Sequence, residues 1–336
     1  ARLLSRAGGG ARPTGTDDSR SETMTVPATQ PRARQLSSPG GPGRIAALKN
    51  WSAFDRRFFR LAALPAFLAV FIITAVPLVI GLGLSFSSVT STHNGVFPLT
   101  LKNYSHIFTD SEVHTVLLNT VIYVVLAVGL ETLLGLGLAL LMTRKNRAIS
   151  VFRVIFLLPL TVAGVAAAIS WGALLNTSQG WVDYFLQLAH LPQPNWLASS
   201  TTALPSVVLV DLWSGVPVVA VIVLAALLSA PRDPIEAALV DGAGAGARFR
   251  YVTFPAIRPA LMLAALLRTV AAFQQFALFQ ILTGGGPGLN TTVLNFYVYQ
   301  QTIVFNNIGY GAALAMLLLL CMAVPLLVLF FFSRRR

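Results

Sequence analysis

Long apolar runs, separated by short polar connections, fill the chain from about residue 61 onward. A helix needs about 20 mostly apolar residues to cross the hydrocarbon core of a bilayer. Six stretches reach that length: 61–86, 115–142, 154–175, 203–228, 256–283 and 308–332. The pattern therefore predicts an all-α membrane protein with six transmembrane helices, joined by connections too short for a further folded domain.

The first 60 residues contain no such run. Residues 1–44 are rich in Gly, Pro, Ser and Arg and cannot bury enough apolar surface to offset the entropy of ordering, so we expect a disordered tail. Residues 45–60 mix basic with aromatic side chains, which is typical of an amphipathic helix in the membrane interface. Met24 is the first methionine, and no function is predicted for the residues before it.

Charge indicates the orientation of the predicted helices. Charged residues make up 11% of the chain, against about 25% in a soluble domain, and the net charge is +12. Of the 24 Lys and Arg residues, all but Lys102 and Arg268 lie in the first 60 residues, in the connections 143–153 and 229–258, or at the C-terminus. The positive-inside rule then places these segments and both termini in the cytoplasm. The connections 87–114, 176–202 and 284–307 are expected outside.

The sequence lacks the residues that most kinds of enzymatic or metal chemistry require. The single cysteine, Cys321, excludes a disulfide framework and is expected to be a packing residue. The four histidines lie in the outer connections without metal-ligand spacing. A phosphate-binding GxxxxGK[ST] loop is absent from the sequence, and the glycines at 242, 244 and 246 do not have dinucleotide-binding spacing. We therefore expect no ATPase activity, cofactor or metal in this chain, and an intramembrane enzyme lacks a nucleophile and base.

A short helix is also predicted within the connection 229–258. Asp233 or Pro234 can begin it, because Pro and acidic residues favour the first turn, and Gly242 can end it. Glu236 and Asp241 stand among small residues in this segment. Taken alone, the segment is either an amphipathic connecting helix or a surface on which another protein docks.

The spacing of this loop, with motifs elsewhere, resembles one family. Glu236-Ala-Ala, Asp241-Gly-Ala, Phe249 and Pro255 stand at the intervals of the EAA loop of the membrane-spanning permease subunits of binding-protein-dependent ABC importers. Further motifs, over about 56–333, are similar to the sugar (maltose-type) branch: Leu101-Lys-Asn103-Tyr104, Asn119-Thr120, Leu158-Pro159, Gly284-Gly-Gly-Pro287, Thr291-Thr292 and Gly309-Tyr-Gly-Ala-Ala. The resemblance implies the type I ABC importer permease fold over 61–333.

The resemblance also implies a mechanism. Such permeases pair with a second, homologous permease subunit in the bacterial cytoplasmic membrane, receive a sugar from an external solute-binding protein, and are driven by a cytoplasmic ABC ATPase dimer that binds ATP and Mg²⁺. The loop helix docks on one ATPase. By this resemblance the coupling residues are Glu236, Ala237, Ala238, Asp241 and Gly242, with Glu236 expected to form a salt bridge to the ATPase.

Three charged residues, Glu131, Asp211 and Arg268, fall inside predicted spans. A charge at mid-bilayer costs at least about 2.5–3.5 kcal/mol, so each needs a partner or a wet cavity. Aligned by the resemblance, the residues on the solute pathway are Leu160, Gly164, Asp211, Ser214, Gly215, Arg268 and Gln275. Arg268 would also suit an anionic solute such as a glycerol phosphate, and Trp171 and Trp213 could stack on a sugar.

Two alternatives remain open at this point. Arg268 could instead form a structural ion pair with Glu131 or Asp211 and never meet the solute. The chain could also be a self-sufficient ion-coupled transporter, with Glu131 carrying protons and Asp211 and Arg268 forming a gating pair. The second alternative gives no reason for the EAA loop. The residues do not identify the solute.

Overall fold

The computed structural model describes residues 53–89, 99–144 and 146–334, and all its elements there are helical. The chain divides into two units, Ala1–Ala66 and Phe67–Arg336. The tail 1–44 and residues 45–52 of the expected interfacial helix lie outside the described residues. Residues 53–60 form the beginning of α2 (Ala53–Ser85), which continues without a break into the first predicted span.

Among the described residues, five helices are long and apolar enough to cross a membrane: Ala62–Ser85, Ser111–Met142, Ala203–Ser229, Ala245–Phe273 and Ile308–Val328. A sixth crossing is present if one bent helix pair counts as a single span. The prediction of an all-α membrane protein is therefore confirmed, and its six spans correspond to these five helices and the bent pair.

The third predicted span is broken. It consists of α5 (Arg147–Leu157), the 3₁₀ turn η1 (Leu158–Thr161) and α6 (Gly164–Leu174), with a bend of 106° between its two halves. Pro159 lacks the N–H that would continue the hydrogen-bond ladder, and Val162 and Ala163 have extended backbone conformations. Hydropathy over 154–175 did not predict this bend, because it reports polarity and not backbone hydrogen bonding; the signal in the sequence was Pro159.

The fifth predicted span is shifted and also broken. The helical stretch begins at α10 (Ala245–Arg248) and continues through a π-helical turn, η2 (Phe249–Thr253), into α11 (Phe254–Phe273). It then breaks before a second π-helical turn, η3 (Phe279–Thr283). At the break, the carbonyl of Gln274 accepts a hydrogen bond of 2.9 Å from Asn295 Nδ2. The Asn295 side chain thereby replaces the backbone N–H that would donate to this carbonyl in a continuous helix.

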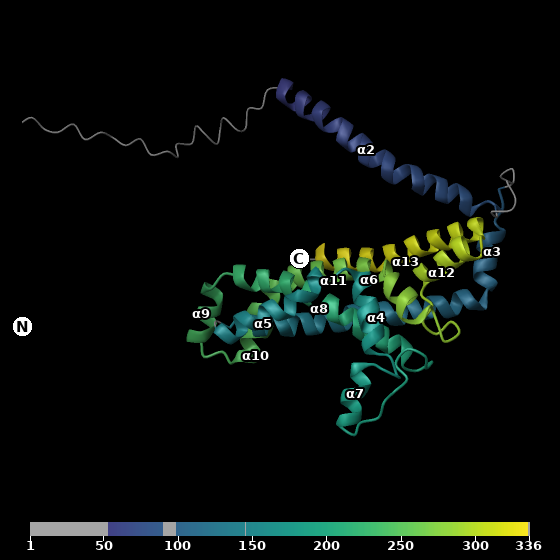
Figure 1. The fold of residues 1–336 in the computed structure, drawn as a ribbon. Coiled ribbons are helices and arrows are strands. Elements are labelled where there is room, and N and C mark those ends of the chain that lie inside the picture. Colours follow the sequence, from purple (N-terminus) through teal and green to yellow (C-terminus); the bar gives the residue numbers. More distant parts are fainter. Residues whose placement is uncertain (1–52, 90–98, 145, 335–336) are drawn as a thin grey trace, which may run out of the picture. The chain divides into compact units, whose positions relative to one another are not determined.

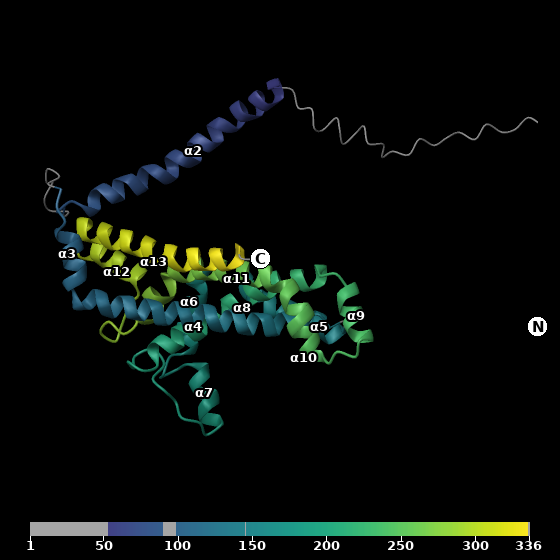
Figure 2. The same cartoon turned by 180° about the vertical axis from the view of Figure 1, so that it is seen from behind.

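The core of the larger unit is formed by α4 (Ser111–Met142), α8 (Ala203–Ser229) and α11, and α4 and α8 run side by side (Figures 1 and 2). A β-carbon added to Gly135 on α4 would stand 2.6 Å from Val219 Cβ on α8. A side chain at this point would collide with α8. The missing side chain of Gly135 is therefore what lets the two helices approach closely.

Several shorter helices lie at the two ends of this core (Figures 1 and 2). One end carries the beginning of α5 with α9 (Asp233–Val240) and α10, and the other carries α3 (Lys102–Thr109) and α12 (Leu294–Tyr299). Further helices are α7 (Trp181–Leu188), the π-helical turn η4 (Gln300–Val304) and α13 (Ile308–Arg334). The connections 143–153 and 229–258 thus lie at the end opposite to 87–114 and 284–307, whereas α7, in the connection 176–202, projects from the side of the bundle (Figures 1 and 2).

Several motif residues hold the connections to the core. Asn119 Nδ2 donates to the carbonyl of Leu289 at 2.7 Å, and Thr120 Oγ1 accepts from the amide of Leu294 at 2.8 Å. These two neighbouring side chains of α4 thereby fix both sides of the loop that precedes α12. Their role in this structure is architectural.

We predict that Gly135→Ala destabilises the protein, because its new methyl group overpacks the contact between α4 and α8, which costs about 1–3 kcal/mol. Gly137→Ala is the matched control, since a β-carbon at Gly137 meets nothing within 4 Å. The midpoint of thermal unfolding in detergent, followed by tryptophan fluorescence, should fall for Gly135→Ala only. Equal midpoints for both variants would contradict the close approach.

Candidate functional site

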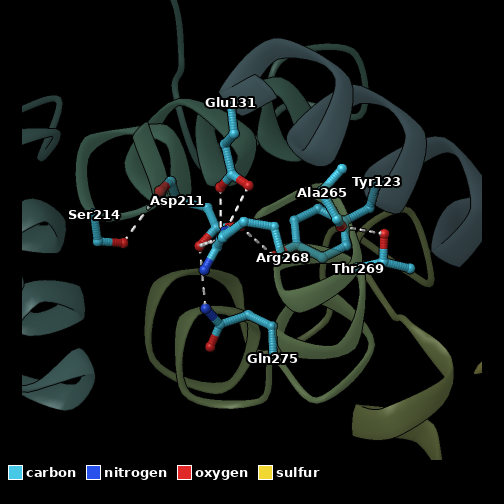
Figure 3. A network of polar contacts seen from close by, with 8 residues as sticks. All are labelled: Tyr123, Glu131, Asp211, Ser214, Ala265, Arg268, Thr269 and Gln275. Atoms are coloured by element: carbon cyan, nitrogen blue, oxygen red, sulfur yellow. Dashed lines mark hydrogen bonds and ion pairs between the residues drawn. The ribbon is translucent and has the colours of Figure 1, made fainter. Parts of the chain in front are cut away.

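The three charged side chains of the spans meet at one point between α4, α8 and α11 (Figure 3). Arg268 grips Glu131 with two hydrogen bonds, Nε to Oε2 at 2.6 Å and Nη2 to Oε1 at 2.5 Å. Its Nη2 also lies 3.3 Å from both carboxylate oxygens of Asp211. One guanidinium therefore connects carboxylates from two other helices.

Two neutral side chains complete this charge network. Tyr123 OH donates to Asp211 Oδ2 at 2.8 Å. Gln275 Nε2 lies 3.3 Å from Asp211 Oδ1 and approaches from the side opposite to Glu131 (Figure 3). Gln275 stands in the break that follows α11. Asp211 is therefore contacted by three different donor side chains.

Tyr123 is a member of the network that the sequence analysis missed. It lies on the same strip of α4 as Glu131 and Gly135, since positions four apart in a helix share a face. The signal available in the sequence was this spacing: a polar-tipped Tyr two turns before a charged residue inside an apolar run.

The charge network is shielded from solvent. The exposed fractions of Glu131 and Asp211 are 0% and 1%, and that of the Arg268 side chain is 11%. Gly215 makes room for it, because a β-carbon there would stand 1.9 Å from Glu131 Oε1 and 2.8 Å from Arg268 Nη2. A glycine in the middle of α8 is thus required by the ion pair, whatever its relation to a solute.

The network has an excess of negative charge. With both carboxylates ionised, it carries two negative charges and one positive charge. The N–H groups at Arg268 Nε and Nη2 already donate hydrogen bonds to carboxylates. The arrangement can therefore accept hydrogen bonds from hydroxyl groups more readily than it can bind a further anion.

The other predicted pathway residues lie in different surroundings. Ser214 is half-buried, and its Oγ donates to the backbone carbonyl of Asp211 at 3.1 Å. Leu160 and Gly164 stand on either side of the break in the third span and are exposed. The structure thus brings together Asp211, Gly215, Arg268 and Gln275, while no polar contact of the network extends to Leu160 or Gly164.

The two tryptophans considered for sugar stacking contact each other. The rings of Trp171 and Trp213 meet edge to face, with centroids 6.0 Å apart. Both line an apolar groove of about 780 Å³ between α4, the broken third span and α8.

The predicted loop helix is present as α9. It begins at Asp233, has Pro234 in its first turn and ends at Val240. Gly242 follows with a positive φ of 73°, which a residue with a side chain rarely adopts. The amide of Gly242 donates to the carbonyl of Leu239 and that of Ala243 to the carbonyl of Ala238, which is the Schellman pattern. Gly242 is therefore needed to end the helix.

The surface of α9 is open. Glu236, Ala237, Asp241 and Gly242 are exposed and Ala238 is half-buried. Within the part of the chain that the structure describes, the carboxylate of Glu236 forms no ion pair. The neighbouring side chains of Leu239 and Val240 have exposed fractions of 52% and 89%. This short helix thus presents an acidic and apolar surface together.

Comparison with known proteins places the chain in a family. Residues 131–336 match the family described as the binding-protein-dependent transport system inner membrane component. The chain is 33% identical over 217 residues to the trehalose/maltose transport system permease protein MalF of Thermococcus litoralis, covering 65% of this chain and 73% of that protein. It is 32% identical over 271 residues to the trehalose transport system permease protein SugA of Mycobacterium tuberculosis H37Rv, covering 80% and 86%.

The fold is also similar to a solved transporter. A chain in the crystal structure of a bacterial alginate ABC transporter, in complex with an alginate pentasaccharide-bound periplasmic protein, aligns with a TM-score of 0.74. The identity is 20%, and the alignment covers 85% of this chain and 97% of that one. Several helices of the structure are long and apolar enough to cross a membrane, which fits such a membrane component. The chain belongs to the family of binding-protein-dependent transport system inner membrane components, and its relatives include permease proteins of sugar transport systems.

We predict that Arg268→Gln destabilises the protein more than Glu131→Gln does. Loss of one partner of a buried ion pair costs about 3–5 kcal/mol. Loss of Arg268 leaves two buried carboxylates without their cation, whereas loss of Glu131 leaves Arg268 in contact with Asp211. The measurement is the thermal midpoint of each variant in detergent. Ser214→Ala, which removes one side-chain hydrogen bond within α8, is the control and should shift the midpoint least. The opposite order of Arg268 and Glu131 would show that Asp211 does not share the guanidinium.

Proposed function

We propose that this chain forms half of a translocation pore together with a second, homologous permease subunit, and that a cytoplasmic ABC ATPase dimer drives the pore. ATP and Mg²⁺ are bound by the ATPases and no cofactor by this chain. The observation that carries the proposal is α9, a capped helix at one end of the bundle: its carboxylates form no ion pair among the described residues, and its Leu239 and Val240 are exposed.

The shape of α9 supports a coupling role. Ala237 and Ala238 let another backbone approach closely, Leu239 and Val240 offer apolar area, and Glu236 offers a charge for a basic side chain of an ATPase. Gly242 fixes the end of this helix. A movement of α9 can therefore be transmitted to α11 through α10 and η2. Asp241 lies at this turn.

The membrane and the outer partner are inferred from relatives. The family is described as an inner membrane component, which supports a place in the bacterial cytoplasmic membrane. The alginate transporter was solved with a solute-bound periplasmic protein, which supports delivery of the solute by an external binding protein. The relatives named for trehalose and maltose support a sugar or oligosaccharide as the solute.

The charge network favours an uncharged sugar over an anionic one. The excess negative charge repels a phosphate or carboxylate, and Arg268 is already held by Glu131 and Asp211. Gln275, half-buried in the break that follows α11, is placed to exchange hydrogen bonds with hydroxyl groups, and it contacts the buried Asp211 behind it. A pathway through Asp211, Ser214, Gly215, Arg268 and Gln275, bounded by Leu160 and Gly164 at the other helix break, therefore suits a polyhydroxylated neutral solute.

The ion-coupled alternative is disfavoured by the same geometry. A proton carrier has to exchange its proton with water, whereas Glu131 is fully buried and gripped by two bonds from Arg268. Protonation of Glu131 would leave the guanidinium with a weaker partner. Glu131 is better suited to hold Arg268 in position.

We predict that Glu236→Ala lowers solute-stimulated ATP turnover of the reconstituted transporter, because the charged contact to the ATPase is lost. Asp233→Ala is the matched control, since it removes an exposed carboxylate from the first turn of the same helix. We expect at least about a tenfold loss for Glu236→Ala, the effect of about 1.4 kcal/mol. Turnover equal to that of the control, in a correctly assembled complex, would refute the coupling role of Glu236.

We predict that Asp211→Asn reduces discrimination against anionic sugars. Asn keeps the shape, and its single carbonyl oxygen can accept from Tyr123 or from Gln275 but not from both in their present places, while the substitution brings the network to electrical neutrality. A charge interaction over about 4 Å at an effective dielectric constant of 20 is worth about 4 kcal/mol, so the change should be large. Inhibition of labelled trehalose uptake by a neutral disaccharide and by a sugar phosphate measures it. An unchanged ratio of the two inhibition constants would show that Asp211 does not face the solute.

A further inference from the structure

A polar pocket lies beside α7, in the connection 176–202 that the sequence predicts to be outside. Its volume is about 380 Å³, within the range of about 300–1,000 Å³ that is usual for ligand sites. Glu131, Asp211 and Arg268 of the charge network are not among its lining residues. Its lining instead combines a carboxylate, three amides and two aromatic rings, which belong to Asp183, Gln179, Gln187, Gln193, Trp181 and Tyr184.

Asp183 supplies the pocket with an acceptor that has no partner. The residue is 5% exposed, and its Oδ1 accepts a hydrogen bond of 2.7 Å from Trp196 Nε1. Its Oδ2 is buried and, within the described residues, has no hydrogen-bond partner. Buried polar atoms are nearly always paired in proteins. An unpaired carboxylate oxygen on a residue that lines a pocket therefore points to a donor that is not part of this chain.

The chain itself holds the pocket in shape. Asn176 Oδ1 accepts from the amide of Ser178 at 2.9 Å, and the amide of Gly180 donates to the carbonyl of Asn176 at 2.7 Å. These bonds fix the turn that leads into α7. Trp196, which holds the carboxylate of Asp183, also packs against the apolar core. The acceptor and the turn are therefore in place before a ligand arrives, which lowers the ordering cost of binding.

The free polar groups of the pocket both donate and accept hydrogen bonds. Gln179, Gln187 and Gln193 are exposed, and among the described residues their side-chain amides form no hydrogen bond. An amide offers a donor and an acceptor, whereas a Lys or Arg side chain only donates. A basic side chain of a partner protein would thus pair with Asp183 but offer nothing to the amide donors. A sugar hydroxyl donates and accepts, so it can pair with both kinds of group.

Two exposed aromatic rings line the same pocket. Trp181 and Tyr184 are 63% and 56% exposed, and their rings meet edge to face with centroids 6.1 Å apart. A ring beside polar groups offers a flat apolar surface to the C–H face of a sugar. Phe185, the next residue of α7, is 59% exposed but does not line the pocket. The two rings of the pocket can therefore be tested separately from the exposed apolar surface of α7.

We propose that this pocket is a saccharide-binding subsite, separate from the charge network. A hydroxyl of a neutral sugar donates to Asp183 Oδ2, further hydroxyls exchange hydrogen bonds with the glutamine amides, and the apolar face of the sugar ring packs against Trp181 or Tyr184. The inference rests on the proposed function, in which the chain handles a sugar. It adds a contact with the solute in a connection that the solute meets before it enters the membrane.

The test uses the assembled transporter containing the full chain, together with a trehalose that carries a photoreactive diazirine. After illumination, mass spectrometry of peptides shows which segments are labelled, so the pocket segment 176–197 and the spans are measured separately. Asp183→Asn replaces the unpaired acceptor by a donor, while its remaining oxygen can still accept from Trp196. Tyr184→Ala removes an exposed ring of the pocket, and Phe185→Ala, which removes an exposed ring outside it, is the matched control.

We expect labelling of 176–197 that unlabelled trehalose competes away. This labelling should fall about tenfold in Asp183→Asn, because a hydrogen bond to a charged acceptor is lost. It should fall in Tyr184→Ala as well and persist in Phe185→Ala. Tyr184 is exposed, so its variant still tests the pocket if Asp183→Asn fails to fold.

Three results would overturn the subsite. One is an equal loss of labelling in Tyr184→Ala and Phe185→Ala, which would assign the binding to the apolar surface of α7. Another is stronger competition by N-acetyl-lysine amide than by trehalose, which would assign the pocket to a basic side chain. The third is labelling confined to the spans, which would refute the subsite and leave the proposed function intact. Absence of both labelling and trehalose uptake in the wild type would instead refute the proposed function together with the subsite.

Discussion

The buried contact of Arg268 with Glu131 and Asp211 is the interaction on which the core depends. A charge inside a membrane is stable only when it is paired, so each of the three side chains requires the other two. They come from three helices, and the contact therefore sets how α4, α8 and α11 lie against one another. Gly215 is part of this constraint, since any side chain at its position would displace the carboxylate of Glu131.

One of the helix breaks contributes a side chain to the charge network. Polar backbone groups inside a membrane have to be satisfied by protein or to line a cavity. The break after α11 places Gln275 on Asp211 and leaves the carbonyl of Gln274 to Asn295. Breaks of this kind near the middle of the membrane are where transporters hold their solutes. The break at Pro159 bends the third span and opens the groove beside it.

The two ends of the bundle are built by different means. At one end the motif side chains Asn103, Asn119 and Thr120 are fully engaged with the backbone of the connections, so this end is held together within the chain. At the other end the carboxylates of α9 form no ion pair among the described residues. A docking partner is therefore expected at that end.

The sequence by itself determined the helical spans, their alternating connections, the capped loop helix and the family, because these depend on local polarity, spacing and turn chemistry. It also marked Glu131, Asp211 and Arg268 as charges that need partners. Only the tertiary structure decided that Arg268 joins both carboxylates, that Tyr123 belongs with them and that two spans are broken. These outcomes depend on contacts between residues as far apart as Glu131 and Arg268, and an apolar run has the same pattern whether its helix is straight or bent.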